Sequence, residues 1–203
     1  LDASLGVFRI ALGSATLDLG VAQDWVDFTA TGGTVSGASG VRIRGQFHAP
    51  GSLVTFTAGA PVEIATNAVM TVSSGRVLLN RDLINRGRIH LTNSAFIQPT
   101  TATIRNLATM EFTAGSYLSA SGAAVQDPRL LNEGEVILRN SANPNGWTQI
   151  LVENRGRIEV LGGRWNPSQS LVNSGEITVG VGTWVQLGTV TTNLPAGRIT
   201  GPG

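Results

Sequence analysis

The sequence contains no cysteine and no lysine, and charged residues make up only 13% of its 203 positions. The absence of cysteine excludes a disulfide framework, a thiolate metal site and a cysteine nucleophile. All 14 basic residues are arginine, and 13 acidic residues balance them, so the net charge of +1 provides no field that attracts nucleic acid. No apolar run approaches the length of a membrane span, and no targeting segment is visible. We therefore expect no nucleic-acid binding and no membrane insertion by this segment.

Glycine and small polar residues are abundant instead. The chain has 26 glycines and is 41% hydrophobic, while its charged fraction is about half of that in an average soluble domain. No stretch repeats apolar residues at the i, i+3, i+4 spacing of an amphipathic helix. This composition is typical of a β-rich chain with many turns.

A short motif recurs along the second half of the chain. It places Gly two residues after Asn, and Ile or Val two residues after Gly, as in Asn154-Arg-Gly156-Arg-Ile158. The copies begin at Asn85, Asn106, Asn132, Asn154, Asn173 and Asn193, the second with Ala for Gly and the last expanded. Counted from the Gly position, the copies are about 19 to 26 residues apart, which suits one coil of a solenoid.

Each copy of the motif predicts a turn followed by a strand. In Arg157-Ile158-Glu159-Val160 the apolar residues alternate, which places one face of a strand inward. We expect the Gly to supply a positive φ and the stacked Asn side chains to form an amide ladder. An apolar pair such as Leu171-Val172 precedes the turn, so each coil should hold two or three strands. The sequence therefore predicts an all-β parallel β-helix, a β-solenoid with coils of about 19–26 residues.

The charges agree with this alignment of the coils. The residue after the Gly position is Arg88, Thr109, Glu135, Arg157, Glu176 and Arg198 in successive copies. The sign alternates through the last four, and equivalent residues of a parallel stack lie directly above one another. We also expect Glu133 to lie beside Arg155.

We expect residues 1–203 to form a single solenoid domain, with irregular coils in 1–82 and regular coils in 83–203. The tetrapeptide Phe56-Thr-Ala-Gly59 recurs as Phe112-Thr-Ala-Gly115, which indicates one architecture for both parts. Because Ile199–Gly203 lies in the middle of another repeat, we expect the chain to be a piece of a longer protein. The handedness of the coil is left open.

The segment Leu171–Leu187 resembles the repeats of large bacterial surface and exported proteins, including filamentous-haemagglutinin-like and autotransporter passenger regions. The resemblance extends over about residues 83 to 203 and implies a secreted or cell-surface location in a bacterium. The absence of cysteine and of an allowed Asn-x-Ser/Thr sequon points the same way.

Residue types that perform catalysis are few and scattered. His48 and His90 lie in different coils without ligand spacing, and we interpret both as surface or turn residues. Asp24 and Asp27 are three residues apart, which would put their carboxylates on opposite faces of a strand. The glutamates of the regular coils have arginine neighbours, so we expect a solvated ladder in preference to a glycosidase pair. We predict no catalytic residue, no metal site and no cofactor, and hence no enzyme.

Aromatic residues provide the one candidate surface. Counting eleven residues from the motif Asn gives an aromatic column, with Trp147 joining if a four-residue insertion precedes it: Phe96, Tyr117, Trp147, Trp165 and Trp184. An outward column would suit stacking on sugar rings or on a neighbouring protein. An internal aromatic stack in the core is the alternative, and both remain open.

These observations predict a structural stalk or adhesin segment that mediates display or attachment. The alternative is a β-helical polysaccharide-binding or polysaccharide-processing protein, including the phage-spike type. The partners we expect are carbohydrate or another surface protein. Because solenoid ends expose strand edges, end-to-end or lateral self-association is a further expectation.

Overall fold

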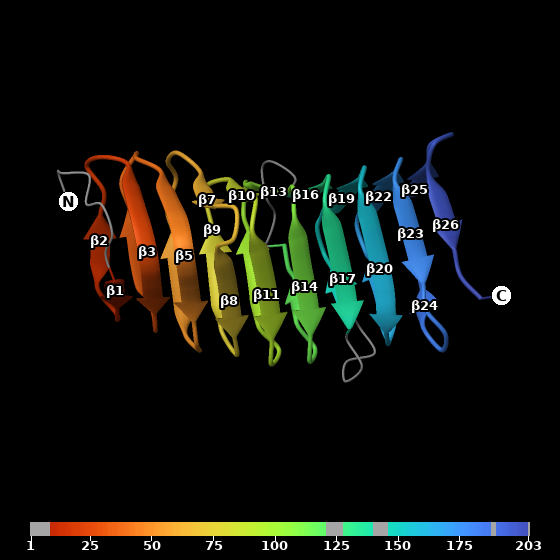
Figure 1. The fold of residues 1–203 in the computed structure, drawn as a ribbon, viewed down its shortest axis with the longest axis horizontal. Coiled ribbons are helices and arrows are strands. Elements are labelled where there is room, and N and C mark those ends of the chain that lie inside the picture. Colours follow the sequence, from red (N-terminus) through yellow and green to blue (C-terminus); the bar gives the residue numbers. More distant parts are fainter. Residues whose placement is uncertain (1–8, 121–127, 140–145, 188–189, 203) are drawn as a thin grey trace.

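The computed structural model describes residues 9–120, 128–139, 146–187 and 190–202. All elements in these ranges are β-strands, and they follow one another along the long axis of the molecule, with the two termini at opposite ends (Figure 1). Every pairing between strands is parallel, and the strands form two sheets of seventeen and nine strands within the described residues. The predicted all-β parallel solenoid is confirmed. None of the described residues forms a helix that is long and apolar enough to cross a membrane.

The larger sheet provides two sides of each regular coil and the smaller sheet provides the third. The larger sheet contains β1 (Arg9–Leu12), β3 (Gln23–Ala30), β5 (Val41–Ala49), β7 (Val62–Ile64), β8 (Val69–Ser73), β10 (Leu83–Asn85), β11 (Arg88–Thr92), β13 (Thr103–Asn106), β14 (Thr109–Thr113), β16 (Arg129–Asn132), β17 (Glu135–Arg139), β19 (Leu151–Asn154), β20 (Arg157–Gly162), β22 (Ser170–Asn173), β23 (Glu176–Val179), β25 (Val190–Asn193) and β26 (Arg198–Thr200). The smaller sheet contains β2 (Thr16–Asp18), β4 (Gly33–Ser36), β6 (Leu53–Phe56), β9 (Arg76–Leu79), β12 (Phe96–Pro99), β15 (Tyr117–Leu118), β18 (Gly146–Thr148), β21 (Arg164–Pro167) and β24 (Trp184–Val185).

The coils change in construction between β5 and β7. The long strand β5 pairs with both β7 and β8, its first half on one and its second half on the other. From β7 onward a turn divides this side of the coil into two strands. In the β7–β8 coil the turn contains Asn67 in the left-handed region, with φ of 68°. In the later coils the Asn-x-Gly motif makes the turn, so each regular coil has three strands.

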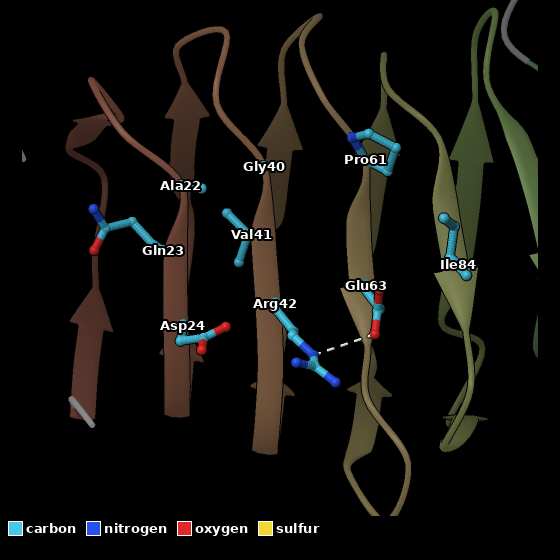
Figure 2. Close-up of a pocket in the computed structure, with 9 residues that line it drawn as sticks. All are labelled: Ala22, Gln23, Asp24, Gly40, Val41, Arg42, Pro61, Glu63 and Ile84. Carbon is cyan, nitrogen blue, oxygen red and sulfur yellow. Dashed lines mark ion pairs between the residues drawn. The ribbon is translucent and has the colours of Figure 1, made fainter. Parts of the chain in front are cut away.

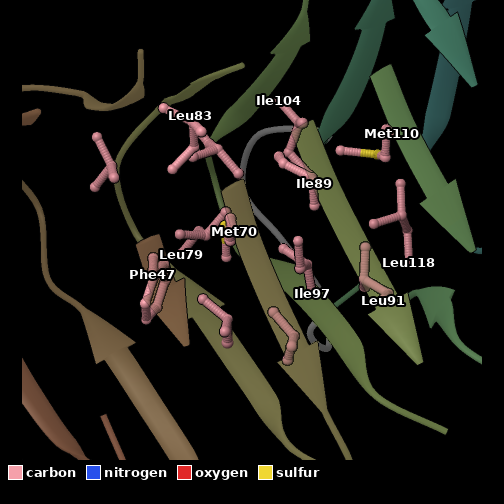
Figure 3. Close-up of a cluster of buried hydrophobic side chains, with 14 of the residues drawn as sticks. Phe47, Met70, Leu79, Leu83, Ile89, Leu91, Ile97, Ile104, Met110 and Leu118 are labelled. Atoms are coloured by element: carbon pink, nitrogen blue, oxygen red, sulfur yellow. The ribbon is translucent and has the colours of Figure 1, made fainter. Parts of the chain in front are cut away.

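The core is a column of apolar side chains enclosed by the two sheets. Ile89, Met110, Val136 and Ile158 occupy one inward position in successive coils, and all four are buried. Figure 3 shows how such residues from neighbouring coils lie against one another, as Met70, Ile89 and Met110 do. The N-terminal coils use aromatic rings instead, with centroid distances of 4.5, 5.1 and 6.0 Å along the series Trp25, Phe28, Phe47 and Phe56.

The predicted amide ladder is present inside the regular coils. Each Nδ2 donates to the Oδ1 of the next coil over 2.7 Å, from Asn85 through Asn106, Asn132, Asn154 and Asn173 to Asn193. The partners are 19 to 26 residues apart, which confirms the predicted coil length. The same nitrogens also donate to the carbonyl of the residue after the Gly position in the next coil, as Asn132 does to Arg157 over 3.0 Å.

The role expected for the motif glycines is wrong. The glycines with positive φ lie at other turns, at 33, 37, 51, 59, 115, 163 and 182. At Gly156 a Cβ atom would lie 2.1 Å from the carbonyl oxygen of Gly134, and at Gly175 it would lie 2.1 Å from that of Gly156. Glycine is required because the turns of adjacent coils approach one another too closely for a side chain.

The predicted charge register is confirmed. Glu135, Arg157, Glu176 and Arg198 occupy successive positions of one outward column. Arg157 lies 3.7 Å from Glu135 and 4.0 Å from Glu176, and Arg155 lies 3.7 Å from Glu133. These arginines are about half exposed, so each pair stabilises the fold by about 0 to 1 kcal/mol.

Candidate functional site

The structure divides the five aromatic residues that the sequence places in one column. Phe96 and Tyr117 are directly in register, and their rings stack with centroids 4.9 Å apart and planes only 9° from parallel. Both side chains are half-buried on the outer side of the smaller sheet. The guanidinium of Arg76 lies 5.8 Å from the Phe96 ring, in the preceding coil. Because the rings stack on one another along the rod, they present their edges to solvent in preference to their faces.

Trp165 departs from this column because it points into the core. Its side chain is only 2% exposed, and its Nε1 donates to the hydroxyl of Thr148 over 3.0 Å. The cause is a bulge in β20, where Leu138 pairs with Val160 but Arg139 pairs with Gly162. Leu161 is therefore an extra residue in this coil, and one extra residue moves the following side chains to the opposite face. The expectation of one continuous column is wrong at Trp165.

Trp184 faces outward and is 70% exposed, but it pairs with Arg164 and not with Trp165. The strand register aligns Leu118 with Thr148, Thr148 with Pro167, and Trp165 with Val185. Followed from strand to strand, this register aligns Tyr117 with a residue two places after Trp184 in the sequence. Trp184 therefore does not continue the column of Phe96 and Tyr117. Of the five candidates, Trp184 offers the most open aromatic surface among the side chains that the structure describes.

Trp147 belongs to β18, where its backbone pairs with that of Asn166. Its side chain lies outside the part of the chain that the structure describes. The carbohydrate or partner surface therefore stays a prediction, now limited to Trp184 and to the edges of the Phe96–Tyr117 stack.

The acidic residues of the larger sheet are engaged by arginines. Glu111 is the most buried of these ion-paired carboxylates, at 11% side-chain exposure, and it contacts Arg88 directly and Arg139 over 3.1 Å. Burial raises the pKa of Glu111, but hydrogen bonds from Arg88 and Arg139 and the charges of Arg88 and His90 outweigh it and hold the pKa below its ordinary value. The solvated ladder predicted for the glutamates fits these contacts, as does the contact of Glu159 with Arg157.

The two histidines share one outward column, which the sequence spacing did not reveal. Both pair with Thr71, so a single coil separates His48 from His90. The ring Nε2 of His90 lies 3.2 Å from the hydroxyl of Thr113. Across the described ranges, no group of three or more His, Asp or Glu side chains is arranged to hold a metal ion.

A shallow hollow of about 410 Å³ lies on the larger sheet over β3, β5 and β7. Figure 2 shows Asp24, Arg42 and Glu63 side by side on its floor, with Pro61 and Gly40 above them. Arg42 lies 3.2 Å from Glu63, and Arg44 lies 3.3 Å from Asp24. Each carboxylate is thus held by an arginine, an arrangement suited to fastening adjacent coils together.

The sequence expectation for Asp24 and Asp27 is wrong. The register between β3 and β5 shifts between Trp25 and Asp27, so this pair does not alternate regularly. Trp25 and Phe28 fill the core, while Asp24 and Asp27 are both partly exposed and line hollows on the outer surface. Their side chains therefore lie on the same face of the strand.

One buried charge has no signal in the sequence. Arg81 is 3% exposed and donates to backbone carbonyls of turns in two earlier coils, at 2.5 Å to Thr57, 2.8 Å to Ser39 and 2.7 Å to Gly37. Further bonds of 3.3 Å reach Ala58 and Ala60. Burial away from water lowers the pKa of the Arg81 guanidinium. Arg81 therefore fastens three successive coils at one corner of the rod.

The described residues define a β-solenoid repeat protein with an internal asparagine ladder. Comparison with protein-family models, with curated proteins and with solved structures gave no match for this chain.

Proposed function

We propose that this chain is a rigid structural segment of a bacterial surface or secreted protein, which displays or attaches other groups at a distance from the cell. The observation that carries the proposal is the continuous ladder of buried asparagines through the regular coils. Five amide–amide bonds of 2.7 Å join six successive coils through the interior, in addition to the parallel backbone pairing of each strand with the next.

Such a stack resists bending because the hydrogen bonds between its interior asparagines require the coils to stay aligned. The ladder residues from Asn85 to Asn173 are fully buried, and separating two coils would leave an amide donor and an amide oxygen without partners. Each such buried group costs about 1–3 kcal/mol. Arg81 and the Arg42–Glu63 ion pair fasten the coils that precede the ladder, and the Arg155–Glu133 pair joins two coils of the ladder on the outer face. A segment with this construction acts as a spacer of fixed length.

The location is supported by the sequence. The Asn-x-Gly repeats resemble those of filamentous-haemagglutinin-like and autotransporter passenger regions, which are exported. A chain without cysteine keeps its fold in an oxidising environment without any disulfide chemistry.

Rigidity is tested by distance measurements on spin-labelled protein. Because the native chain lacks cysteine, single cysteines introduced at the exposed Thr16 and Thr200 accept labels specifically. We expect one narrow distance distribution near roughly 40 Å, from about 4.8 Å per coil. A broad distribution would contradict a rigid spacer.

Display and attachment are tested on cells that carry the chain on an outer-surface anchor with an epitope fused beyond it. We expect antibody access to the epitope and adhesion to coated surfaces to require the folded rod. The matched control is the same fusion with both Asn132→Asp and Asn154→Asp, whose two buried carboxylates we expect to unfold the regular coils at neutral pH. Equal display and adhesion by both fusions would contradict the proposal.

A second candidate, polysaccharide binding, is favoured by the 70% exposure of Trp184. Trp25 and Trp165 are buried, so quenching by acrylamide should report mainly on Trp184 among the described indole rings. A polysaccharide that binds there protects this emission from quencher, and Trp184→Ala abolishes the protection. Protection that survives Trp184→Ala would exclude this residue as the binding platform.

A further inference from the structure

The charged and aromatic side chains of the rod are divided between its two sheets. Every ion pair between side chains that the structure describes lies on the larger sheet or at its turns, as Arg42–Glu63 and Arg157–Glu135 do. The strands of the smaller sheet contain a single carboxylate, that of Asp18 in β2. The described aromatic side chains that are not buried all lie on the smaller sheet: Phe96, Tyr117 and Trp184. The outer face of the smaller sheet therefore differs in chemistry from the ion-paired face.

Arg76 is a partly exposed arginine on this outer face, at the start of β9. None of the carboxylates that the structure describes lies within ion-pair distance of Arg76, and its guanidinium lies instead 5.8 Å from the centroid of the Phe96 ring. A guanidinium offers a planar pair of donors that matches the oxygens of a carboxylate or a similar oxyanion. Because its partner within the fold is a neutral ring, Arg76 keeps the capacity to bind an anion from solution.

The two rings next to Arg76 present their edges to that anion. Phe96 pairs with Arg76 in the preceding coil and with Tyr117 in the following coil, and its ring stacks on that of Tyr117 with centroids 4.9 Å apart. Aromatic rings carry a negative face and a positive edge. Since both faces of the Phe96 ring are occupied, the edges meet solvent, and positive edges suit oxygen atoms that carry negative charge.

The strand register extends this site along the rod. Arg76, Phe96 and Tyr117 form one row across three successive coils, and the row continues to the partly exposed Asn166. Arg164, which also has no carboxylate partner among the described side chains, lies four coils beyond Arg76. At about 4.8 Å per coil, the two arginines are roughly 19 Å apart along the axis. A small anion cannot contact both arginines, whereas an extended polymer can.

We propose that the outer face of the smaller sheet binds an acidic polysaccharide along the rod axis, with a carboxylate or sulfate of the glycan on Arg76 and its hydroxyl groups on the edges of Phe96 and Tyr117. Two arginines roughly 19 Å apart complement a sparsely charged polymer better than a nucleic acid, whose phosphates are about 3.4 Å apart along one strand. Nucleic-acid bases also require open ring faces for stacking, and both faces of Phe96 are occupied. This inference does not rest on the spacer function, and it concerns a different place and class of glycan from the Trp184 platform.

The probes are fluorescently labelled polygalacturonate, hyaluronan and chondroitin sulfate, whose binding to the whole chain is followed by fluorescence anisotropy. We expect saturable binding of at least one of them, and no Arg76-dependent binding of methyl-esterified polygalacturonate, which is neutral. Arg76→Gln should weaken binding of the acidic polysaccharide by at least about tenfold, because hydrogen bonds to a charged group are lost. Arg44→Gln is the matched control, because it removes the same charge from the larger sheet, and it should leave binding unchanged. Circular dichroism checks that both variants keep the fold.

The position of the site is tested at Tyr117, which is the only tyrosine of the chain. Incorporated fluorotyrosine therefore places a single fluorine reporter on this face. We expect its NMR resonance to shift as the acidic polysaccharide saturates the protein, both in the native chain and in Trp184→Ala, but not in Arg76→Gln at the same concentration.

Four results would overturn the proposal. They are no binding of any acidic polysaccharide up to roughly 1 mM sugar units, equal weakening by Arg44→Gln and Arg76→Gln, an unshifted fluorine resonance at saturation, and tighter binding of a single-stranded oligonucleotide than of every polysaccharide. Each of them leaves the spacer function standing, because the spin-label distances test that function separately.

Discussion

The asparagine ladder makes a specific prediction about a single isosteric substitution. Asn132 accepts a hydrogen bond from Asn106 over 2.7 Å and donates to Asn154 over 2.7 Å and to the carbonyl of Arg157 over 3.0 Å. Asn132→Asp keeps the size and the acceptor but removes the amide donor. An ionised carboxylate at this position faces two oxygen atoms in a fully buried site.

The magnitude follows from the buried charge. A fully buried carboxyl without a cationic partner has its pKa raised by about 3 units or more above the unfolded value near 3.9. Each unit corresponds to 1.36 kcal/mol, so Asn132→Asp should cost about 4 kcal/mol at pH 7. When protonated, the carboxyl provides one O–H donor, and the remaining cost falls to about 1 kcal/mol.

The sign of the pH dependence is fixed by linkage. Because the folded-state pKa of the introduced carboxyl is raised, the variant loses stability relative to wild type as pH rises from about 4 to about 7. The assay is urea unfolding by circular dichroism between pH 3 and pH 8. Asn93→Asp is the matched control, because Asn93 is exposed in a turn, and we expect a change within about 0.5 kcal/mol at every pH. A cost below about 1 kcal/mol at pH 7, or a cost independent of pH, would refute the role of the ladder.

Three further substitutions test the remaining contacts by the same unfolding measurement. Gly156→Ala should cost about 1–3 kcal/mol or more, because its Cβ would lie 2.1 Å from a backbone oxygen, whereas Gly13→Ala meets nothing within 4 Å and should be neutral; equal effects would contradict the close-approach argument. Arg81→Met should cost about 3 kcal/mol, because it leaves turn carbonyls in two coils without their donor, and a neutral result would show that water replaces the guanidinium. Glu111→Gln should cost about 1 kcal/mol at pH 7; since the pKa of Glu111 is lowered, the ionised form stabilises the fold above the ordinary value of 4.5, and the difference from wild type should vanish as pH falls through the lowered pKa. A difference that persists at low pH would mean that packing, and not charge, is responsible.

The sequence predicted those features that depend on a repeat of constant length. Aligning the glycines placed Asn154 over Asn132 and Arg157 beside Glu135, because these residues lie within a few positions of the reference glycine. The predicted positions of side chains became less accurate with distance from the reference glycine. The extra residue Leu161 in β20 turned Trp165 into the core, and an irregularity after Trp25 brought Asp24 and Asp27 to one face. A bulge has no reliable signature in one sequence, since it only shifts a period of two by one residue.

Arg81 could not have been found from the sequence for a different reason. Its partners are backbone carbonyls of residues 21 to 44 positions earlier in the chain, and a carbonyl carries no side-chain identity to detect. The aromatic column is interrupted at Trp165 for the first reason, and the stacking of Phe96 on Tyr117 depends on ring orientation. Neither the orientation of a ring nor a contact with a backbone carbonyl can be predicted from residue types.

The inward column that holds the ladder also explains why the two parts of the chain differ in composition. Its earlier members are Trp25, Ile43 and Ile64, and asparagine occupies it only from Asn85 onward. In the early coils β3 and β5 run through this region as single strands, so an apolar side chain is sufficient, and in the β7–β8 coil a longer turn, residues 65–68, follows Ile64. From β10 onward the chain turns sharply after the Asn, and the carbonyl after the Gly position needs a donor from inside the coil, which the amide of the preceding coil provides. The Asn and the Gly of the motif thus act together in the close packing of the turns. The glycine lets the turns of adjacent coils approach, and the asparagine amide donates a hydrogen bond to the carbonyl that this approach buries.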